Sequence, residues 1–272
     1  MPCFRLTLEY DGTDFAGSQS QPRQRTVQGE LERALRRIHR DSVRTVFAGR
    51  TDRGVHAIGQ VAACSLSGWR QDCRALRRAL TATLPPDMGP VAVERCHDSF
   101  NPRFDAVWRE YRYAIALENA GPFLRRYAHE LRSEVSLPAF ATAAASLVGT
   151  HDFASFAGGG EGVPWSERAS RPRGTTRTVF CCECRESAKS FGPASGRAIR
   201  TLEFRVIADA FLPSMVRTMV GAVIEIGQGR REAGWIDWLL TAADRRSGAA
   251  VAPAKGLCLW RVGFDDDHWE EW

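Results

Sequence analysis

Lysine is almost absent from this chain of 272 residues. Of its 37 basic side chains 35 are arginine, and only Lys189 and Lys255 are lysine. The planar fork of arginine suits contacts to phosphate and stacking on bases, but a genome-wide bias toward arginine explains the same composition. The net charge of +5 is modest, so composition alone permits a nucleic-acid partner without requiring one.

The chain also lacks a long apolar run. No segment approaches the roughly 18 apolar residues that a membrane-spanning helix needs, and residues 1–10 alternate like a strand rather than resembling a signal peptide. The content of 44% hydrophobic and 25% charged residues is typical of a globular protein. We therefore expect a cytoplasmic protein that does not associate with membranes.

Paired cysteine spacing is missing as well. The eight cysteines are scattered, which argues against a secreted disulfide framework and predicts reduced thiols. Cys181 and Cys184 form one C-x-x-C, but no second pair or histidine follows at a zinc-like spacing. The glycine run at 158–160 lacks the lysine and Ser/Thr of a phosphate-binding P-loop. We expect no metal site.

The length allows about two domains. In the first half, hydrophobic periodicity predicts strands at 4–10, 43–48, 56–66 and 90–97, and helices at 27–38 and 72–83. The order βαββαβ is that of the ferredoxin-like fold, which RNA-recognition domains also use. Arginines recur on both helices, at positions 33, 36, 37 and 40 and at positions 70, 74, 77 and 78. These faces either follow a phosphate backbone or are simply solvated.

A similar pattern begins after residue 105. It predicts strands at 111–115, 178–184, 199–208 and 257–264, and helices at 137–148, 212–228 and 233–243. The last helix is expected to bury Trp235, Trp238, Leu239 and Leu240, and the segment 158–176 to be a long irregular loop.

Together these patterns predict an α+β protein. It should consist of two ferredoxin-like domains, 1–105 and 106–265, with largely antiparallel sheets and an acidic tail at 266–272. We expect the domains to join around a central basic cleft, which is the natural place for a site.

One carboxylate stands out in the sequence. Asp52 lies in a glycine-flanked turn, residues 49–54, between two strand-like runs. Glycines let the backbone approach a ligand closely, and the neighbouring Arg50 and Arg53 favour an ionised carboxylate. Such a group suits a nucleophile, although ordinary hairpin chemistry with solvated arginines explains the local composition too.

The longer string from Gly49 to Val61 resembles the signature of the tRNA pseudouridine synthase TruA family, and Asp52 falls on its catalytic aspartate. Further matching segments follow in the family's order, at residues 10–17, 26–32, 103–106, 109–113, 149–153, 211–217 and 254–257. The resemblance covers almost the whole chain, and this collinearity makes chance a poor explanation.

The resemblance implies an isomerase that converts uridine to pseudouridine at positions 38, 39 and 40 of the tRNA anticodon stem-loop. It also implies a homodimer that needs neither metal nor organic cofactor. Asp52 takes the role of essential nucleophile or base, Arg217 that of the arginine paired with this carboxylate, and Tyr111 that of the ring stacked on the target uracil. Arg50 falls on the arginine beside the flipped nucleotide, and Arg53 and His56 are assigned to RNA binding with it.

Without the match, these residues have plainer interpretations. Tyr111 and Tyr113 would be packed on one face of a strand, and an arginine near a helix start would be solvated. His56, like His151, would be a structural hydrogen-bonding residue. The chain departs from the family at Ser18, where an aromatic residue is usual, and at residues 213–214.

Two rival functions belong to other classes. A catalytically inactive RNA-binding protein on the same scaffold would be favoured by loss of Asp52, Tyr111 or Arg217, and all three are present. A metal-dependent nuclease needs clustered carboxylates, for which Asp11 and Asp14 are the remote candidates beside Asp52.

Overall fold

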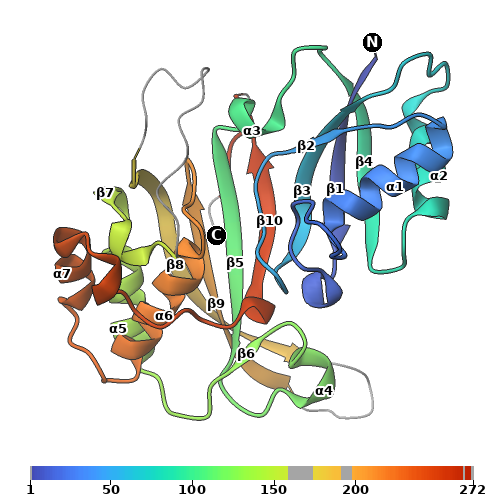
Figure 1. The fold of residues 1–272 in the computed structure, drawn as a ribbon. Helices are drawn as coiled ribbons and strands as arrows, with labels where there is room; N and C mark the ends of the chain where they lie inside the picture. Colours follow the sequence, from blue (N-terminus) through green and yellow to red (C-terminus); the bar gives the residue numbers. More distant parts are fainter. Residues whose placement is uncertain (1, 159–173, 191–197, 266, 271–272) are drawn as a thin grey trace. The chain divides into compact units, whose positions relative to one another are not determined.

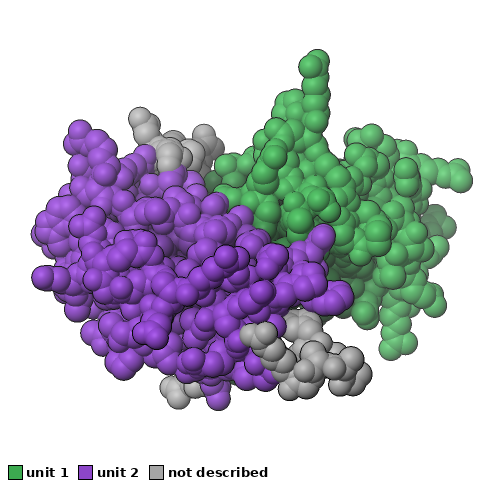
Figure 2. Space-filling view, turned by 90° about the horizontal axis from the view of Figure 1, so that it is seen from below, with its two compact units in different colours: residues 1–109, 258–272 green, residues 110–257 purple. Residues whose placement is uncertain are grey.

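The computed structural model describes residues 2–158, 174–190, 198–265 and 267–270. Most of the expected loop at 158–176 and part of the expected tail at 266–272 therefore lie outside the described residues. The chain divides into two compact units, residues 1–109 with 258–272 (unit 1) and residues 110–257 (unit 2), which Figure 2 shows in green and purple. The division falls near the expected limit at 105/106, but it groups the C-terminal strand with unit 1.

Unit 1 contains every strand and helix that the sequence predicts between residues 4 and 97. Its elements are β1 (Cys3–Tyr10), η1 (Gly12–Asp14), α1 (Val27–His39), β2 (Thr45–Phe47), β3 (His56–Ser65), α2 (Cys73–Thr83), β4 (Met88–Cys96), α3 (Pro102–Asp105) and β10 (Leu257–Gly263), whose first residue belongs to unit 2.

The two long helices of unit 1 begin at side-chain caps. The Thr26 hydroxyl accepts a hydrogen bond from the Gly29 N–H (3.2 Å), and the Asp72 carboxylate accepts one from the Ala75 N–H (2.7 Å). Both helices bury one apolar stripe, which includes Leu31 in α1 and Leu76 in α2. Their arginines therefore lie on the opposite, solvent-facing side.

Strand pairing in unit 1 is mostly antiparallel. β1 pairs with both β3 and β4, and β2 pairs with β3, so the neighbours run β4, β1, β3, β2. β10 is parallel to β3, with Cys258 opposite His56 and Leu259 opposite Ala57. This parallel pairing explains why the last strand belongs with the first half of the chain (Figure 1).

Unit 2 carries the second set of strands and helices. Its elements are β5 (Trp108–Ala116, whose first two residues belong to unit 1), α4 (Gly121–Leu124), β6 (His129–Glu130), α5 (Leu137–Ala145), β7 (Gly149–Asp152), η2 (Ala154–Phe156), β8 (Thr176–Ser190), β9 (Ala198–Ala208), α6 (Met215–Gly227), α7 (Trp235–Ala242), η3 (Arg245–Ser247) and η4 (Ala254–Gly256).

The strands of unit 2 are arranged in the order β5, β9, β8, β7, and the short strand β6 pairs with β5. β8 is antiparallel to both β7 and β9, while β6 is parallel to β5. α5 packs against α6 and against β8. The expected class, α+β with largely antiparallel strands, is confirmed. Among the helices of the described residues, none is long and apolar enough to cross a membrane.

Two local predictions are only partly right in unit 2. Of the four side chains expected to be buried in α7, Leu239 is buried and Trp235 and Leu240 are half-buried, whereas Trp238 is 53% exposed and Ile236 is buried instead. The helix is turned so that the i, i+3 pair Ile236 and Leu239 faces the core, which places Trp238 on the outside. β8 extends to Ser190 because residues 185–190 pair with residues 203–198 of β9. Backbone pairing rather than hydrophobic pattern sets the length of that strand.

Candidate active site

Asp52 lies in the turn between β2 and β3, and its side chain is half-buried. The Val55 N–H donates to the Asp52 carbonyl (3.1 Å) and closes the turn, with Gly54 at φ +78°. A residue with a side chain is strained in that conformation, so a glycine is required there. Arg50 and Arg53 are exposed on either side, and Arg53 donates to the Gln24 amide oxygen (2.9 Å).

Ser18 fixes the residue before Asp52. Its backbone N–H donates to the Thr51 carbonyl (3.0 Å), and its hydroxyl accepts a hydrogen bond from the Thr51 N–H (2.9 Å). Ser18 is 1% exposed. The preceding Gly17 has φ +107°, and a Cβ there would lie 2.9 Å from the Thr51 carbonyl oxygen. The sequence marks Ser18 only as a departure from the family, yet the structure gives it a positioning role.

A network of three buried polar side chains, Tyr10, Thr51 and Gln60, supports the same turn. The hydroxyls of Tyr10 and Thr51 are 2.8 Å apart, and the Gln60 amide donates to the Tyr10 hydroxyl (3.4 Å) and to the Gly49 carbonyl (3.1 Å). Burial raises the pKa of Tyr10 to about 12, against the opposing effect of the hydrogen bond with Thr51. Its hydroxyl therefore stays protonated at neutral pH and keeps both partners.

Arg109 anchors the other side of the turn. This residue is 8% exposed, and its guanidinium donates to the carbonyls of Ala48 (3.1 Å), Arg103 (3.1 Å) and Ala106 (2.9 Å). It thus ties the residue that follows β2 to the α3 segment. Together with the hydrogen bonds of Ser18 to Thr51 and of Gln60 to Gly49, this contact restricts the backbone of the turn.

His56 is buried (7% exposed) and interacts with the η1 segment. Its Nδ1 accepts a hydrogen bond from the Gly12 N–H (3.0 Å) and lies 3.2 Å from an Asp11 carboxylate oxygen. The geometry favours the structural interpretation of His56 over direct RNA binding.

The remote carboxylates of the nuclease hypothesis have other contacts. Asp11 caps η1 by accepting from the Thr13 N–H (3.0 Å). Across the described parts of the chain, no three His, Cys, Asp or Glu side chains form a group that could hold a metal ion.

In unit 2, Tyr111 lies on β5 and is 7% exposed. Its ring meets Phe211 edge to face, with centroids 5.1 Å apart and an interplanar angle of 86°. Tyr113, two residues along the strand, shares that face. Its hydroxyl donates to the Pro253 carbonyl (2.8 Å). Burial raises the pKa of Tyr113 well above its ordinary value, while the positive charge of Arg217 acts in the opposite direction.

Arg217 lies in the first turn of α6 and is half-buried. Its Nε donates to the Ala252 carbonyl (2.7 Å), and the Ala252 N–H donates back to the Arg217 carbonyl (3.1 Å). The side chain is thus held by the segment before β10, unlike a solvated arginine at a helix start. Arg217 and Tyr113 thus bind the carbonyls of two adjacent residues, Ala252 and Pro253.

The opposite face of β5 carries buried charges. Arg205 (2% exposed) binds Glu110 (3% exposed) at 2.9 Å and Glu183 at 2.7 Å. Arg112 bridges Glu110 (2.8 Å) and Glu203 (3.1 Å). Burial lowers the pKa of Arg205, but the two carboxylates outweigh that effect and raise it overall. We call these five residues the Glu110–Arg205 cluster; because β5 alternates, it supports the strand behind Tyr111.

Residues 7–105 and 143–265 match the protein family described as tRNA pseudouridine synthase. The chain belongs to this family. The matched segments of the family contain Asp52 and Arg217, whereas Tyr111 lies in the interval between them. The sequence-based recognition of the family is therefore confirmed.

Several relatives in the family share one name, tRNA pseudouridine synthase A. The protein of Geobacillus kaustophilus (strain HTA426) is 40% identical over 271 residues, covering 97% of this chain and 95% of its own length. That of Moorella thermoacetica is 39% identical, covering 97% and 100%, and that of Cutibacterium acnes is 38% identical, covering 98% and 91%.

Proposed function

We propose that this chain isomerises uridine to pseudouridine at positions 38, 39 and 40 of the tRNA anticodon stem-loop. Its family makes it an isomerase that acts on uridine in tRNA. The observation that carries the proposal is the Asp52 turn, which presents the acid of the family signature on a backbone held by Ser18 and Arg109. The shared name of the relatives supports the same reaction.

In the proposed reaction the bond between N1 of uracil and C1′ of ribose breaks, and a bond between C5 and C1′ forms. The proton on C5 is lost and N1 gains one, so the atoms balance without a co-reactant. Asp52 serves as the essential nucleophile or base. Its half-buried position between two exposed arginines leaves it accessible to a nucleotide.

We assign Arg217 and Tyr111 of unit 2 to the nucleotide that Asp52 attacks. Arg217 pairs with the carboxylate and keeps it charged when RNA excludes water. Its anchored Nε supports this role because it gives the guanidinium a fixed direction. Tyr111 stacks on the uracil. Since that ring is 7% exposed against Phe211, stacking requires that RNA binding uncover it.

Arg50 fills the space left by the flipped nucleotide, and Arg53 contacts the RNA beside it. Both are exposed in unit 1, as these roles require. For His56 we propose that it holds η1 in place next to the turn rather than contacting RNA.

The strand order β4, β1, β3, β2 in unit 1 supports a ferredoxin-like domain. We further propose that the two halves join around a basic cleft and that the enzyme acts as a cytoplasmic homodimer without metal or organic cofactor. These features follow from the family resemblance.

The test is pseudouridine mapping on unmodified tRNA transcripts incubated with the purified chain. Transcripts with a single uridine at position 38, 39 or 40 should each gain pseudouridine there, and transcripts with cytidine at all three should gain none. Excess chelator should leave the reaction unchanged. Bound but unmodified tRNA would instead identify the inactive RNA-binding protein, and RNA cleavage that stops on chelation would identify the nuclease.

A further inference from the structure

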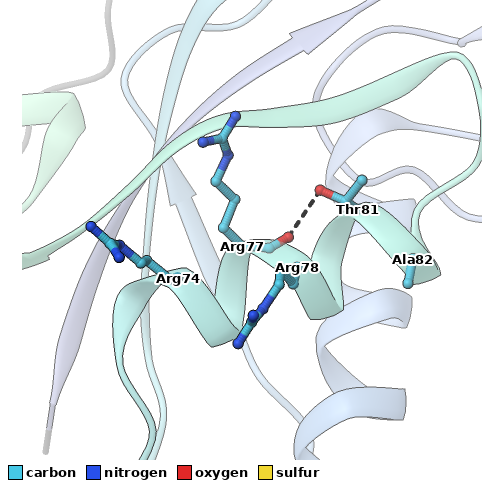
Figure 3. Close-up of a pocket in the computed structure, with 5 residues that line it drawn as sticks. All are labelled: Arg74, Arg77, Arg78, Thr81 and Ala82. Atoms are coloured by element: carbon cyan, nitrogen blue, oxygen red, sulfur yellow. Dashed lines mark hydrogen bonds between the residues drawn. The ribbon is translucent and has the colours of Figure 1, made fainter.

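The outer face of α2 carries a basic hollow whose lining contains none of the residues assigned to the site. Arg74, Arg77, Arg78, Thr81 and Ala82 line a space of about 490 Å³, and Figure 3 shows the three arginine side chains extending from α2 in different directions. All three arginines are exposed. The Thr81 hydroxyl donates its hydrogen to the Arg77 carbonyl (3.0 Å). The groups that can donate to an anion in the hollow are therefore the three guanidinium groups. We call this site the α2 arginine hollow.

The positive charge of the hollow is not balanced by acids. Helix α2 contains no acidic residue, and the Asp72 carboxylate before it caps the helix. Within the described residues, Arg74, Arg77 and Arg78 form no ion pair with a carboxylate. Arg77 is held against β4 by a hydrogen bond from its Nε to the Pro90 carbonyl (3.4 Å).

Helix α1 provides an internal comparison. Arg33, Arg36 and Arg37 have the same i, i+3, i+4 spacing as the arginines of the hollow. In α1, however, Arg33 pairs with Glu30 at 2.6 Å. Like charges at i and i+4 destabilise a helix by roughly 0.2–0.5 kcal/mol. The repulsion in α2 is therefore uncompensated within the protein, and an external anion would relieve it.

The position of α2 relates the hollow to the Asp52 turn. After α2, the Asp87 carbonyl accepts from the Asp11 N–H (2.9 Å), and Asp11 lies against His56 at the start of β3. The C-terminal end of α2 thus lies at the end of unit 1 that carries Asp52. Arg78 is five residues before that end, about 8 Å along the helix axis.

We propose that the α2 arginine hollow binds backbone phosphate of the tRNA, away from the nucleotide being isomerised. The proposal rests on the function proposed above. Arginine forks bind phosphate oxygens in pairs, and an exposed site without base-reading groups senses charge rather than sequence. RNA is favoured over a free anion because the hollow is open and exposed, and its donors are spread over more than one helical turn.

The experiment compares two double variants of the full chain. Arg74→Gln/Arg78→Gln removes two charges from the hollow but keeps Arg77, which contacts the protein. Arg33→Gln/Arg37→Gln removes two charges at the same spacing from α1. Circular dichroism and thermal melts establish that both fold, and binding to an unmodified tRNA transcript is measured between 50 and 300 mM salt, a range chosen to define the slope.

For the α2 variant, the slope of log K against log salt should decrease by about 0.7 to 1.8, which corresponds to one or two phosphate contacts. Affinity near 100 mM salt should fall about tenfold. The single-turnover rate at saturating tRNA should stay within about twofold of wild type, because these residues do not touch the target. The α1 variant should change the slope by less than half as much.

Equal slope changes in both variants, or none in the α2 variant, would overturn the proposal. A separate arm adds inorganic phosphate at constant ionic strength. If phosphate binds wild type but not the α2 variant while the RNA slopes of the two agree, the hollow is a free-anion site and the proposal fails. Failure of the isomerase proposal is recognised independently, because wild-type protein would then form no pseudouridine in the same tubes.

Discussion

The Asp52 turn and the Glu110–Arg205 cluster differ in how deeply their charged groups are buried and in what surrounds those groups. Asp52 is half-buried in a turn whose support comes mainly from neutral hydrogen bonds, such as those from Ser18 and Gln60. Glu110 and Arg205 are almost fully buried, and each neutralises the other. A carboxylate that reacts with a substrate must be accessible and charged. A fully buried charge, in contrast, is tolerated only beside a partner of opposite charge.

The comparison separates stability from activity. Loss of the Asp52 charge should remove chemistry with little effect on the fold, because the residue lies half-buried in a turn rather than in the core. Loss of Arg205 should loosen the fold without touching the reacting atoms. The four predictions below test that separation, from the largest expected effect to the smallest.

Asp52→Asn should lower the single-turnover rate at least about a thousandfold, since it removes the charge and keeps the shape. Its free energy of unfolding should stay within about 0.5 kcal/mol of wild type, because the residue is in a turn. Rapid-quench pseudouridine assays and urea titrations measure the two quantities. The control is Asp41→Asn, at a side chain that is 77% exposed in unit 1. A rate near that of wild type would remove Asp52 from the mechanism.

Arg205→Met should destabilise the protein by about 3–5 kcal/mol, because the buried Glu110 keeps Arg112 but loses the buried guanidinium, and Glu183 loses its ion pair with Arg205. The matched control is Arg200→Met, which breaks an exposed pair with Glu186 between the same two strands, β9 and β8. That change should cost less than about 1 kcal/mol. Similar losses in the two variants, measured by denaturant unfolding, would contradict the distinction between buried and exposed charge.

Ser18→Ala should affect both properties moderately. The buried Thr51 N–H loses its side-chain acceptor, at a cost of about 1–3 kcal/mol. A turn displaced by a fraction of an ångström should also slow turnover by roughly 10- to 100-fold. The exposed Ser20→Ala serves as control. Unchanged turnover in Ser18→Ala, with stability lost, would show that the hydroxyl supports the fold but not the geometry of Asp52.

Tyr10→Phe should produce the smallest effect and a specific pH signature. The folded-state pKa of Tyr10 is raised to about 12, above the value of about 10 in an unfolded chain. The unfolded state therefore loses its proton first, and the contribution of Tyr10 to stability is full below pH 10 and declines between pH 10 and 12.

Tyr10→Phe should lose roughly 1 kcal/mol at neutral pH and show a shallower decline of stability above pH 10. Parallel unfolding titrations at pH 8, 10 and 11 on variant and wild type provide the measurement. Identical slopes would show that the Tyr10 hydroxyl does not hold its proton as described. Tyr113→Phe is a matched comparison in unit 2, because burial raises the pKa of Tyr113 as well.

Local pattern was sufficient for much of the fold and for proposing Asp52 as the catalytic residue. Hydrophobic periodicity, helix caps and turn residues predicted the ends of the strands and helices of unit 1 to within a few residues. Each of these signals depends only on residues that are close together in the sequence. The Asp52 turn was found in the same way, since its glycines and charges are adjacent in sequence. The family followed from the order of the motifs.

Contacts between distant residues required the tertiary structure. Ser18 meets Thr51 across 33 positions and Arg205 meets Glu110 across 95, and nothing near either residue indicates its partner. The same holds for β10, which pairs with β3 about 200 residues away. The periodic pattern of apolar and polar residues indicates which face of a helix or strand a side chain occupies. Only tertiary packing decides which residues that face contacts. The sequence alone determined the acid, and the fold decided what holds it in place.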